Sequence, residues 1–95
     1  MFCVNVMLTA HDEADVPEIR DNLAKAAAMS REEHDCVRFE VYHSESDPKC
    51  FLLCERWESE QAWKDHRERE AVQTIYIPLV LPKVDRTPHI STIVE

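Results

Sequence analysis

Among the residues that could do chemistry, His66 has the side chain best suited to proton transfer near neutral pH. A neutral imidazole can take a proton from a phenol and leave an electron-rich anion that reacts directly with dioxygen. We therefore take His66 as a candidate general base. The alternative is a structural histidine that packs its helix and bonds to Glu55 or to a backbone carbonyl.

Asn5 stands in the middle of an apolar segment that is typical of a strand, where asparagine is disfavoured. On a cavity wall its amide could hold a substrate oxygen, which makes Asn5 the second candidate catalytic residue. The alternative is an amide that is bonded to a neighbouring group or faces solvent.

Arg38, Glu40 and Glu55 are charged residues inside otherwise apolar strand segments. Arg38 could bind an anionic oxygen of a substrate and a carboxylate such as that of Glu40 could act as a base, so both are candidate substrate-binding residues. We favour the alternative of a cross-strand ion pair, joining Arg38 to Glu40 or Glu55 and closing a dimer.

Aromatic side chains could stack on a planar substrate, although at this spacing they more often belong to a core. We assign Phe39 and Trp57 to the core. Trp63 and Tyr76 are candidate walls of a substrate pocket.

No cofactor or metal signature accompanies these residues. Glycine is absent, which excludes the Gly-rich phosphate loops and the dinucleotide-binding fingerprint. The four cysteines have no Cys-x-x-Cys spacing, and a zinc site of Cys50, Cys54 and His43 is disfavoured because its spacing is unusual for zinc ligands. We expect no cofactor and no metal.

The charge balance bears on partners and location. The formal net charge is −8, with 11 basic residues interspersed among 19 acidic ones, which argues against nucleic acid and against anionic membranes as partners. No stretch approaches the roughly 20 apolar residues of a membrane span. With no export signal and four unpaired thiols, the expected location is cytoplasmic.

Apolar periodicity predicts the elements that must position these residues. We expect strands over 2–10, 36–44, 50–57 and 89–94, and helices over 15–33 and 60–69, with a further helical stretch over 70–77 that ends before Pro78. An Asp15–Glu18 capping box and an N-cap at Ser59 would start the two main helices. The order β-α-β-β-α-β predicts a single α+β domain over residues 1–95, with a ferredoxin-like antiparallel sheet.

One face of that sheet would lack a helical cover. Its residues mix polar and apolar types: Cys3, Asn5, Met7, Arg38, Glu40 and Tyr42. We expect two copies to pack these faces together as a homodimer, a dimeric α+β barrel, and to leave a ligand-sized cavity between them.

Three segments resemble motifs of the antibiotic biosynthesis monooxygenase (ABM) domain family. They read EHDCVRFEVY over 33–42, FLLCERWES over 51–59 and QAWKDH over 61–66, and the tail over 81–95 is similar to quinol monooxygenase-like members. The departure is His34-Asp35, where the family has Pro-Gly. The resemblance implies a dimeric α+β barrel and matches His66 to the histidine of the family's helix motif.

From the resemblance we expect a cofactor-independent monooxygenase that uses dioxygen on a small aromatic substrate such as a quinol or phenol. His66 would be the base and Asn5 the oxygen-holding group, in a pocket lined by Trp63 and Tyr76. Two alternatives stay open: an isomerase or heme-degrading relative, and a non-catalytic dimeric ligand-binding module. Heme-degrading relatives tend to carry Trp where His66 stands, which argues against heme.

Overall fold

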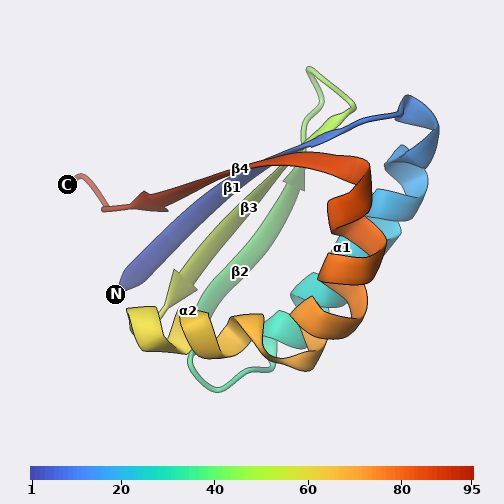
Figure 1. The fold of residues 1–95 in the computed structure, drawn as a ribbon. Helices are drawn as coiled ribbons and strands as arrows, with labels where there is room; N and C mark the ends of the chain where they lie inside the picture. The colour runs from blue at the N-terminus through green and yellow to red at the C-terminus, as the bar shows by residue number, and fades with distance from the viewer.

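A computed structural model describes all 95 residues and shows one antiparallel sheet with helices on one side (Figure 1). The strand order is β2-β3-β1-β4, and each neighbouring pair is antiparallel. The elements are β1 Phe2–Ala10, η1 Glu13–Asp15, α1 Val16–Arg31, β2 Cys36–His43, β3 Cys50–Trp57, α2 Glu60–Arg67, η2 Ala71–Val80, η3 Leu81–Lys83 and β4 Val84–Ser91. The predicted ferredoxin-like α+β fold is confirmed.

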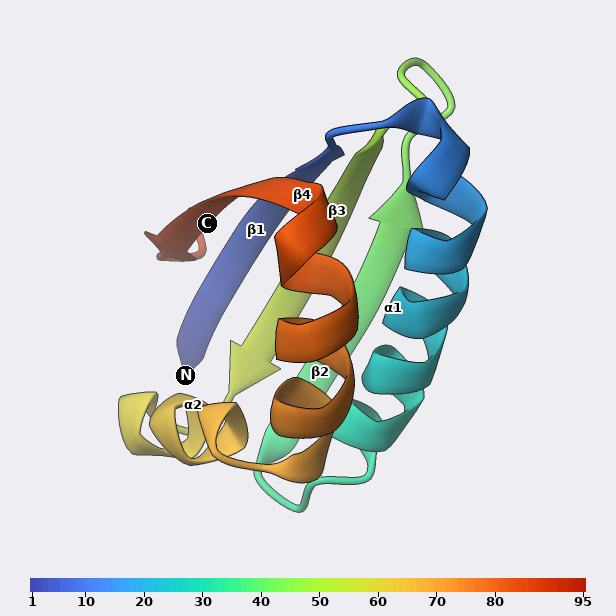
Figure 2. The same ribbon diagram turned by 45° about the vertical axis from the view of Figure 1, so that its right-hand side comes forward.

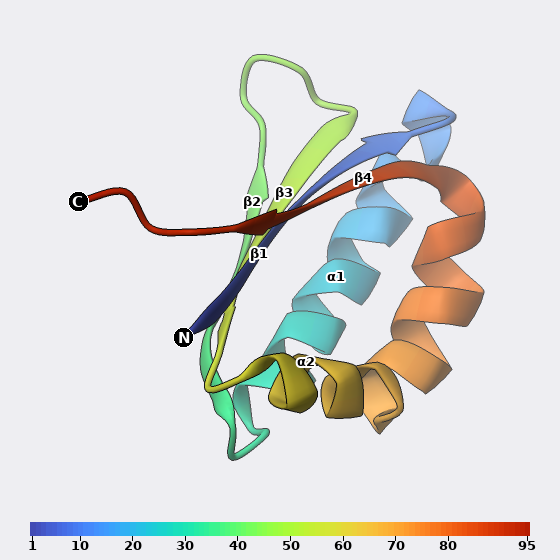
Figure 3. The ribbon, with the colours of Figure 1, turned by 60° about the vertical axis from the view of Figure 1, so that its left-hand side comes forward.

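The sheet has one covered face and one bare face. α1 and η2 lie alongside each other over the covered face (Figure 2). Seen from the side, all the helices lie on that one side of the sheet (Figure 3). Successive side chains of a strand point to opposite faces of the sheet. The position of a residue along its strand therefore decides whether it lies on the covered face or on the bare face.

Strand β1 shows this alternation of side chains most clearly. Val4, Val6 and Leu8 are fully buried under the helices, whereas Asn5 and Met7 alternate with them and are exposed on the bare face. Because β1 pairs with both β3 and β4, it forms the middle of the core.

The first residues of α1 and α2 show whether the predicted N-caps form. The Ser59 hydroxyl accepts a hydrogen bond from Ala62 N at 3.1 Å, so this cap is confirmed. The predicted Asp15 cap is wrong, because Asp15 makes no capping hydrogen bond. Asp12 instead caps η1 by accepting from Ala14 N at 2.9 Å, and α1 continues directly from that turn.

The chain beyond α2 departs from prediction at its prolines. The helical stretch does not stop before Pro78 but continues as the wide helix η2 to Val80. Pro78 removes one backbone donor, yet Ala71 and Val80 are buried on either side of it and hold the segment against the core. The last strand spans Val84–Ser91 rather than 89–94 and includes Pro88, which is tolerated because β4 is an edge strand.

A register shift between Cys36 and Arg38 alters the start of β2. The sequence alternation places Val37 with Phe39 and Val41 on the core face, but Val37 is 44% exposed because the irregularity turns it outward. No helix is both long enough and apolar enough to span a bilayer.

Candidate functional site

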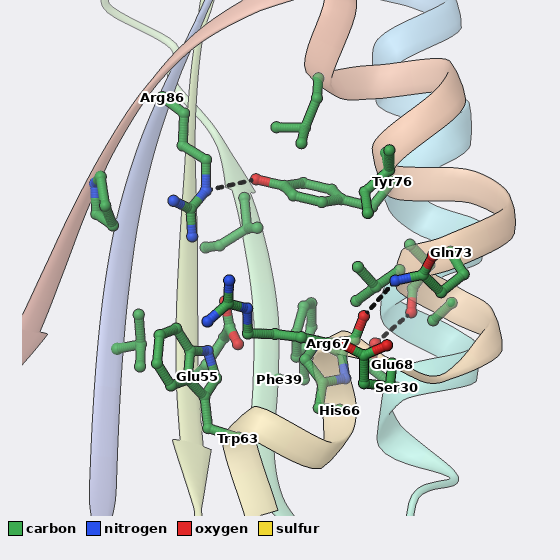
Figure 4. Close-up of a pocket in the computed structure, with 18 of the residues that line it drawn as sticks. Ser30, Phe39, Glu55, Trp63, His66, Arg67, Glu68, Gln73, Tyr76 and Arg86 are labelled. Atoms are coloured by element: carbon green, nitrogen blue, oxygen red, sulfur yellow. Dashed lines mark hydrogen bonds between the residues drawn. The ribbon is translucent and has the colours of Figure 1, made fainter. Parts of the chain in front are cut away.

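A cavity of about 560 Å³ lies between the covered face of the sheet and the helical layer of α2 and η2 (Figure 4). Its size falls within the range of small-molecule sites. The walls are largely apolar, and the side chains that could do chemistry there are Glu55, Trp63, His66, Arg67, Tyr76 and Arg86. This cavity lies inside one protomer, between its sheet and its helices, and the predicted cavity between two copies of the chain stays a prediction.

His66 is held in place by a carboxylate from a distant part of the chain. It is 5% exposed, and its Nδ1 lies 3.0 Å from Oε2 and 3.2 Å from Oε1 of Glu33. Burial lowers the pKa of His66, against the opposing effect of Glu33. Burial thus favours the neutral form of the imidazole. Because a carboxylate can only accept, Nδ1 carries the hydrogen and Nε2 is free to take a proton.

The carboxylate of Glu33 is in turn oriented by Arg69. Arg69 Nη1 donates to Glu33 Oε1 at 2.7 Å and to Asp35 Oδ1 at 2.8 Å, and Nη2 donates to Asp35 Oδ2 at 3.1 Å. Hydrogen bonding to Arg69 holds the pKa of Asp35 below its usual range. Position 35, where the resembled family has glycine, therefore carries a carboxylate that is ion-paired with Arg69.

Glu55 contributes a second acid–base group to the cavity. It is in phase with the core residues Leu53 and Trp57 on β3 and is 8% exposed. Burial raises the pKa of Glu55 to about 7, although Trp57 Nε1 donates to its Oε1 at 3.0 Å. Glu55 thus lines the cavity beside His66 and is partly protonated near pH 7.

Tyr76 and Trp63, both predicted as pocket walls, do line the cavity. Tyr76 Oη accepts a hydrogen bond from Arg86 Nε at 3.2 Å, and burial raises the pKa of Tyr76. The Arg67 guanidinium lies 5.1 Å from the centre of the Trp63 ring, a cation–π contact.

The structure does not bring the other predicted site residues to this cavity. Asn5 is exposed on the bare face, separated from His66 by the sheet. Arg38 and Glu40 also lie on that face, where Arg38 Nε donates to Glu40 Oε1 at 2.9 Å and Tyr42 Oη donates to the same oxygen at 2.6 Å. The favoured pair of Arg38 with Glu40 is therefore present, but it lies within β2 rather than across two strands, and its role in closing a dimer stays a prediction.

Sequence reasoning missed part of the site. It treated Glu55 as a pairing partner of Arg38, although the alternation of β3 already places Glu55 on the core face. Glu33 begins the first of the family motifs and Arg67 directly follows the third, but residue type and spacing assign neither of them a role. No local signal marks Arg86, which β4 brings to the cavity.

Comparison with known proteins adds to this geometry. A family model described as antibiotic biosynthesis monooxygenase matches residues 1–76. The chain belongs to this family. No curated protein matches the sequence significantly.

Several solved structures resemble the ABM chain in fold. An antibiotic biosynthesis monooxygenase is 17% identical with a TM-score of 0.86, covering 98% of this chain and 99% of its own. A provisionally named antibiotic biosynthesis monooxygenase from Nitrosomonas europaea is 18% identical with a TM-score of 0.86 and the same coverage of both chains, 98% and 99%. A Bacteroides thetaiotaomicron protein described as a possible oxidoreductase is 16% identical with a TM-score of 0.87, covering 95% of this chain and 94% of its own. At these identities the likeness establishes the fold.

Proposed function

We propose that this ABM protein is a cofactor-independent monooxygenase that oxidises a small phenol or quinol with dioxygen in the cavity beside His66. The observation that carries the proposal is the Glu33–His66 pair. It presents a neutral imidazole to an apolar cavity with Nδ1 already bonded at 3.0 Å and Nε2 free. Family membership supports the reaction class.

For a phenol that carries hydrogen on the carbon opposite its oxygen, the chemistry balances without an external reductant. Nε2 of His66 takes the phenolic proton, and the phenolate carbon opposite the oxygen forms a C–O bond with dioxygen. The imidazolium returns its proton to give a hydroperoxide. Loss of the proton on that carbon then breaks the O–O bond and releases water. A phenol and one dioxygen become a quinone and one water, so the substrate supplies all four electrons.

Asn5 has no part in this sequence of steps, because it faces the other side of the sheet. Its predicted role in holding an oxygen stays a prediction for a ligand on the bare face. The same applies to substrate binding by Arg38 and Glu40, whose mutual contact already satisfies both charges.

We place a second copy of the chain on the bare face. Tyr42, Leu52 and Met7 form a row across three neighbouring strands and are 48%, 40% and 45% exposed. Large apolar side chains gathered on one face mark an interaction surface. Two copies related by a two-fold axis would bury the row against itself, which supports the homodimer.

Dioxygen uptake with 1-naphthol or menadiol, in an electrode cell containing chelator and no flavin, tests the reaction. We expect one dioxygen consumed per quinone formed from 1-naphthol, and one ¹⁸O atom in that quinone under ¹⁸O₂. Uptake that requires added flavin or metal would contradict the cofactor-independent reaction. Tight binding of both compounds without uptake would favour the ligand-binding module.

A further inference from the structure

Two arginines from different elements line the same cavity. Arg67 is at the end of α2 and Arg86 is on β4, and both side chains are directed into the cavity, toward the region of Glu55 (Figure 4). In a chain of net charge −8, these two guanidinium groups place positive charge at a largely apolar cavity, whose lining also includes Glu55 and Glu68.

Arg67 keeps its hydrogen-bond donors available. Its guanidinium lies over the face of Trp63, 5.1 Å from the ring centre, and makes no hydrogen bond or ion pair with any residue of the chain. Stacking uses the face of the guanidinium and leaves the N–H groups at its edge free. The ring of Phe2 packs against Trp63 at 5.4 Å and so supports the stack.

The Arg86 side chain makes a single hydrogen bond within the protein, through one nitrogen atom. Nε donates to Tyr76 Oη at 3.2 Å, while the two terminal nitrogens have no partner in the protein. Two carboxyl groups line the cavity, those of Glu55 and Glu68. Glu55 accepts a hydrogen bond from Trp57, and neither carboxyl group forms an ion pair with either arginine.

Two other arginines of the chain use their guanidinium groups in ion pairs with carboxylates. Arg38 bonds to Glu40, and Arg69 bonds to Glu33 and Asp35. Arg67 and Arg86 are positioned by aromatic neighbours, and the terminal N–H groups of both guanidinium groups have no partner in the protein. Guanidinium groups in this state are suited to carboxylate and phosphate oxygens.

We propose that the cavity binds a small aromatic molecule carrying an anionic oxygen group, a carboxylate or a phosphate, which is held between Arg67 and Arg86. This inference names the substrate class of the proposed monooxygenase and rests on that function. The anionic group lies at the arginines. The aromatic body occupies the apolar part of the cavity along Val4, Leu53 and Ile90, and its hydroxyl group reaches His66.

Calorimetric titration with matched naphthalene probes tests the proposal in the unmodified protein. 2-Naphthoate should bind at least tenfold more tightly than the neutral 2-naphthalenemethanol, because each charge-assisted hydrogen bond adds affinity. 2-Naphthyl phosphate distinguishes the two anions: tighter binding than naphthoate assigns a phosphate, and weaker binding assigns a carboxylate. Equal affinities for all three probes would overturn the proposal.

Substitutions locate the anion. Arg67→Gln and Arg86→Gln should each weaken naphthoate binding about tenfold and leave binding of the alcohol within about twofold. Arg20→Gln removes the same charge from an exposed position on α1 outside the cavity, and it should change neither affinity. Loss of naphthoate affinity in Arg20→Gln equal to that in the other two variants would show a general charge effect and overturn the proposal.

Turnover separates this inference from the proposed function. If 1-naphthol is oxidised and the acidic analogue 1-hydroxy-2-naphthoate has no advantage in kcat/KM, the anion site is wrong and the oxygenase stands. If the acidic probes bind selectively but no naphthol consumes dioxygen, the oxygenase is wrong and the anion site stands.

Discussion

Nδ1 of His66 lies 3.0 Å from Oε2 of Glu33, a contact that ties α2 to the segment between α1 and β2. The carboxylate fixes which nitrogen carries the hydrogen, and Arg69 fixes the carboxylate at 2.7 Å. Mutation of a residue that orients a functional side chain in this way commonly lowers affinity or activity about 10- to 100-fold, as is known for the partners of metal-ligating histidines.

The first prediction concerns Glu33 as a positioning residue. Because Glu33 raises the pKa of His66 against burial, Glu33→Gln should lower that pKa further and reduce kcat about tenfold with little change in KM. The acid limb of the pH–rate profile, which for the unmodified protein should lie below the ordinary histidine pKa of 6.5, should move to lower pH. Glu32→Gln, at the neighbouring exposed position, is the control. An unmoved limb would refute the positioning role.

The second prediction concerns stability. Arg69→Met leaves Glu33 and Asp35 without their cation, and we expect a loss of about 2 kcal/mol in the free energy of unfolding at pH 7. Since the pKa of Asp35 is lowered in the folded protein, its contribution is present above about pH 4 and is lost as pH falls through the folded pKa. Urea titration at pH 7 measures the loss, with Arg20→Met as control. Equal stability of the two variants would argue against the network.

The third prediction concerns Glu55. Its pKa is raised to about 7 from 4.5, so the folded state binds the proton more tightly than the unfolded state, and stability falls as pH rises between those values. The full penalty above pH 7 is roughly 3 kcal/mol by linkage. Glutamine at this position cannot ionise. The free energy of unfolding of Glu55→Gln should therefore rise relative to that of the unmodified protein between pH 5 and pH 8. Thermal or urea unfolding at both pH values checks this, and a pH-independent difference would contradict the buried acid.

The fourth prediction concerns the bare face. Light scattering should give twice the 11.1 kDa chain mass for the unmodified protein. Leu52→Lys places a charge in the middle of the apolar row and should give the single-chain mass. Leu79→Lys, at a 41% exposed position on η2, should leave the mass unchanged. A single-chain mass for the unmodified protein would contradict the proposed homodimer.

Local patterns sufficed for much of the fold. The alternation of β1 and the Ser59 cap are decided by neighbouring residues, so both could be read from the sequence. Pro78 and Val37 could not, because burial of flanking residues and a register shift override their local preferences.

The site divides in the same way. His66, Trp63 and Tyr76 could be predicted because residue type and motif mark them. The placement of Asn5 away from His66 follows from strand parity together with the position of the helices, and the helical layer is a tertiary feature. Glu33 reaches His66 across 33 positions of sequence, a distance at which no periodicity acts.

Dioxygen uptake with 1-naphthol by the His66→Gln variant tests the account most directly. Glutamine can still donate to Glu33 but cannot take a proton, so the rate should fall at least a hundredfold, within the range of general base catalysis. His89→Gln, at an exposed position of β4, should keep the full rate. A His66→Gln protein that remains folded and oxidises the naphthol at the unmodified rate would contradict the account.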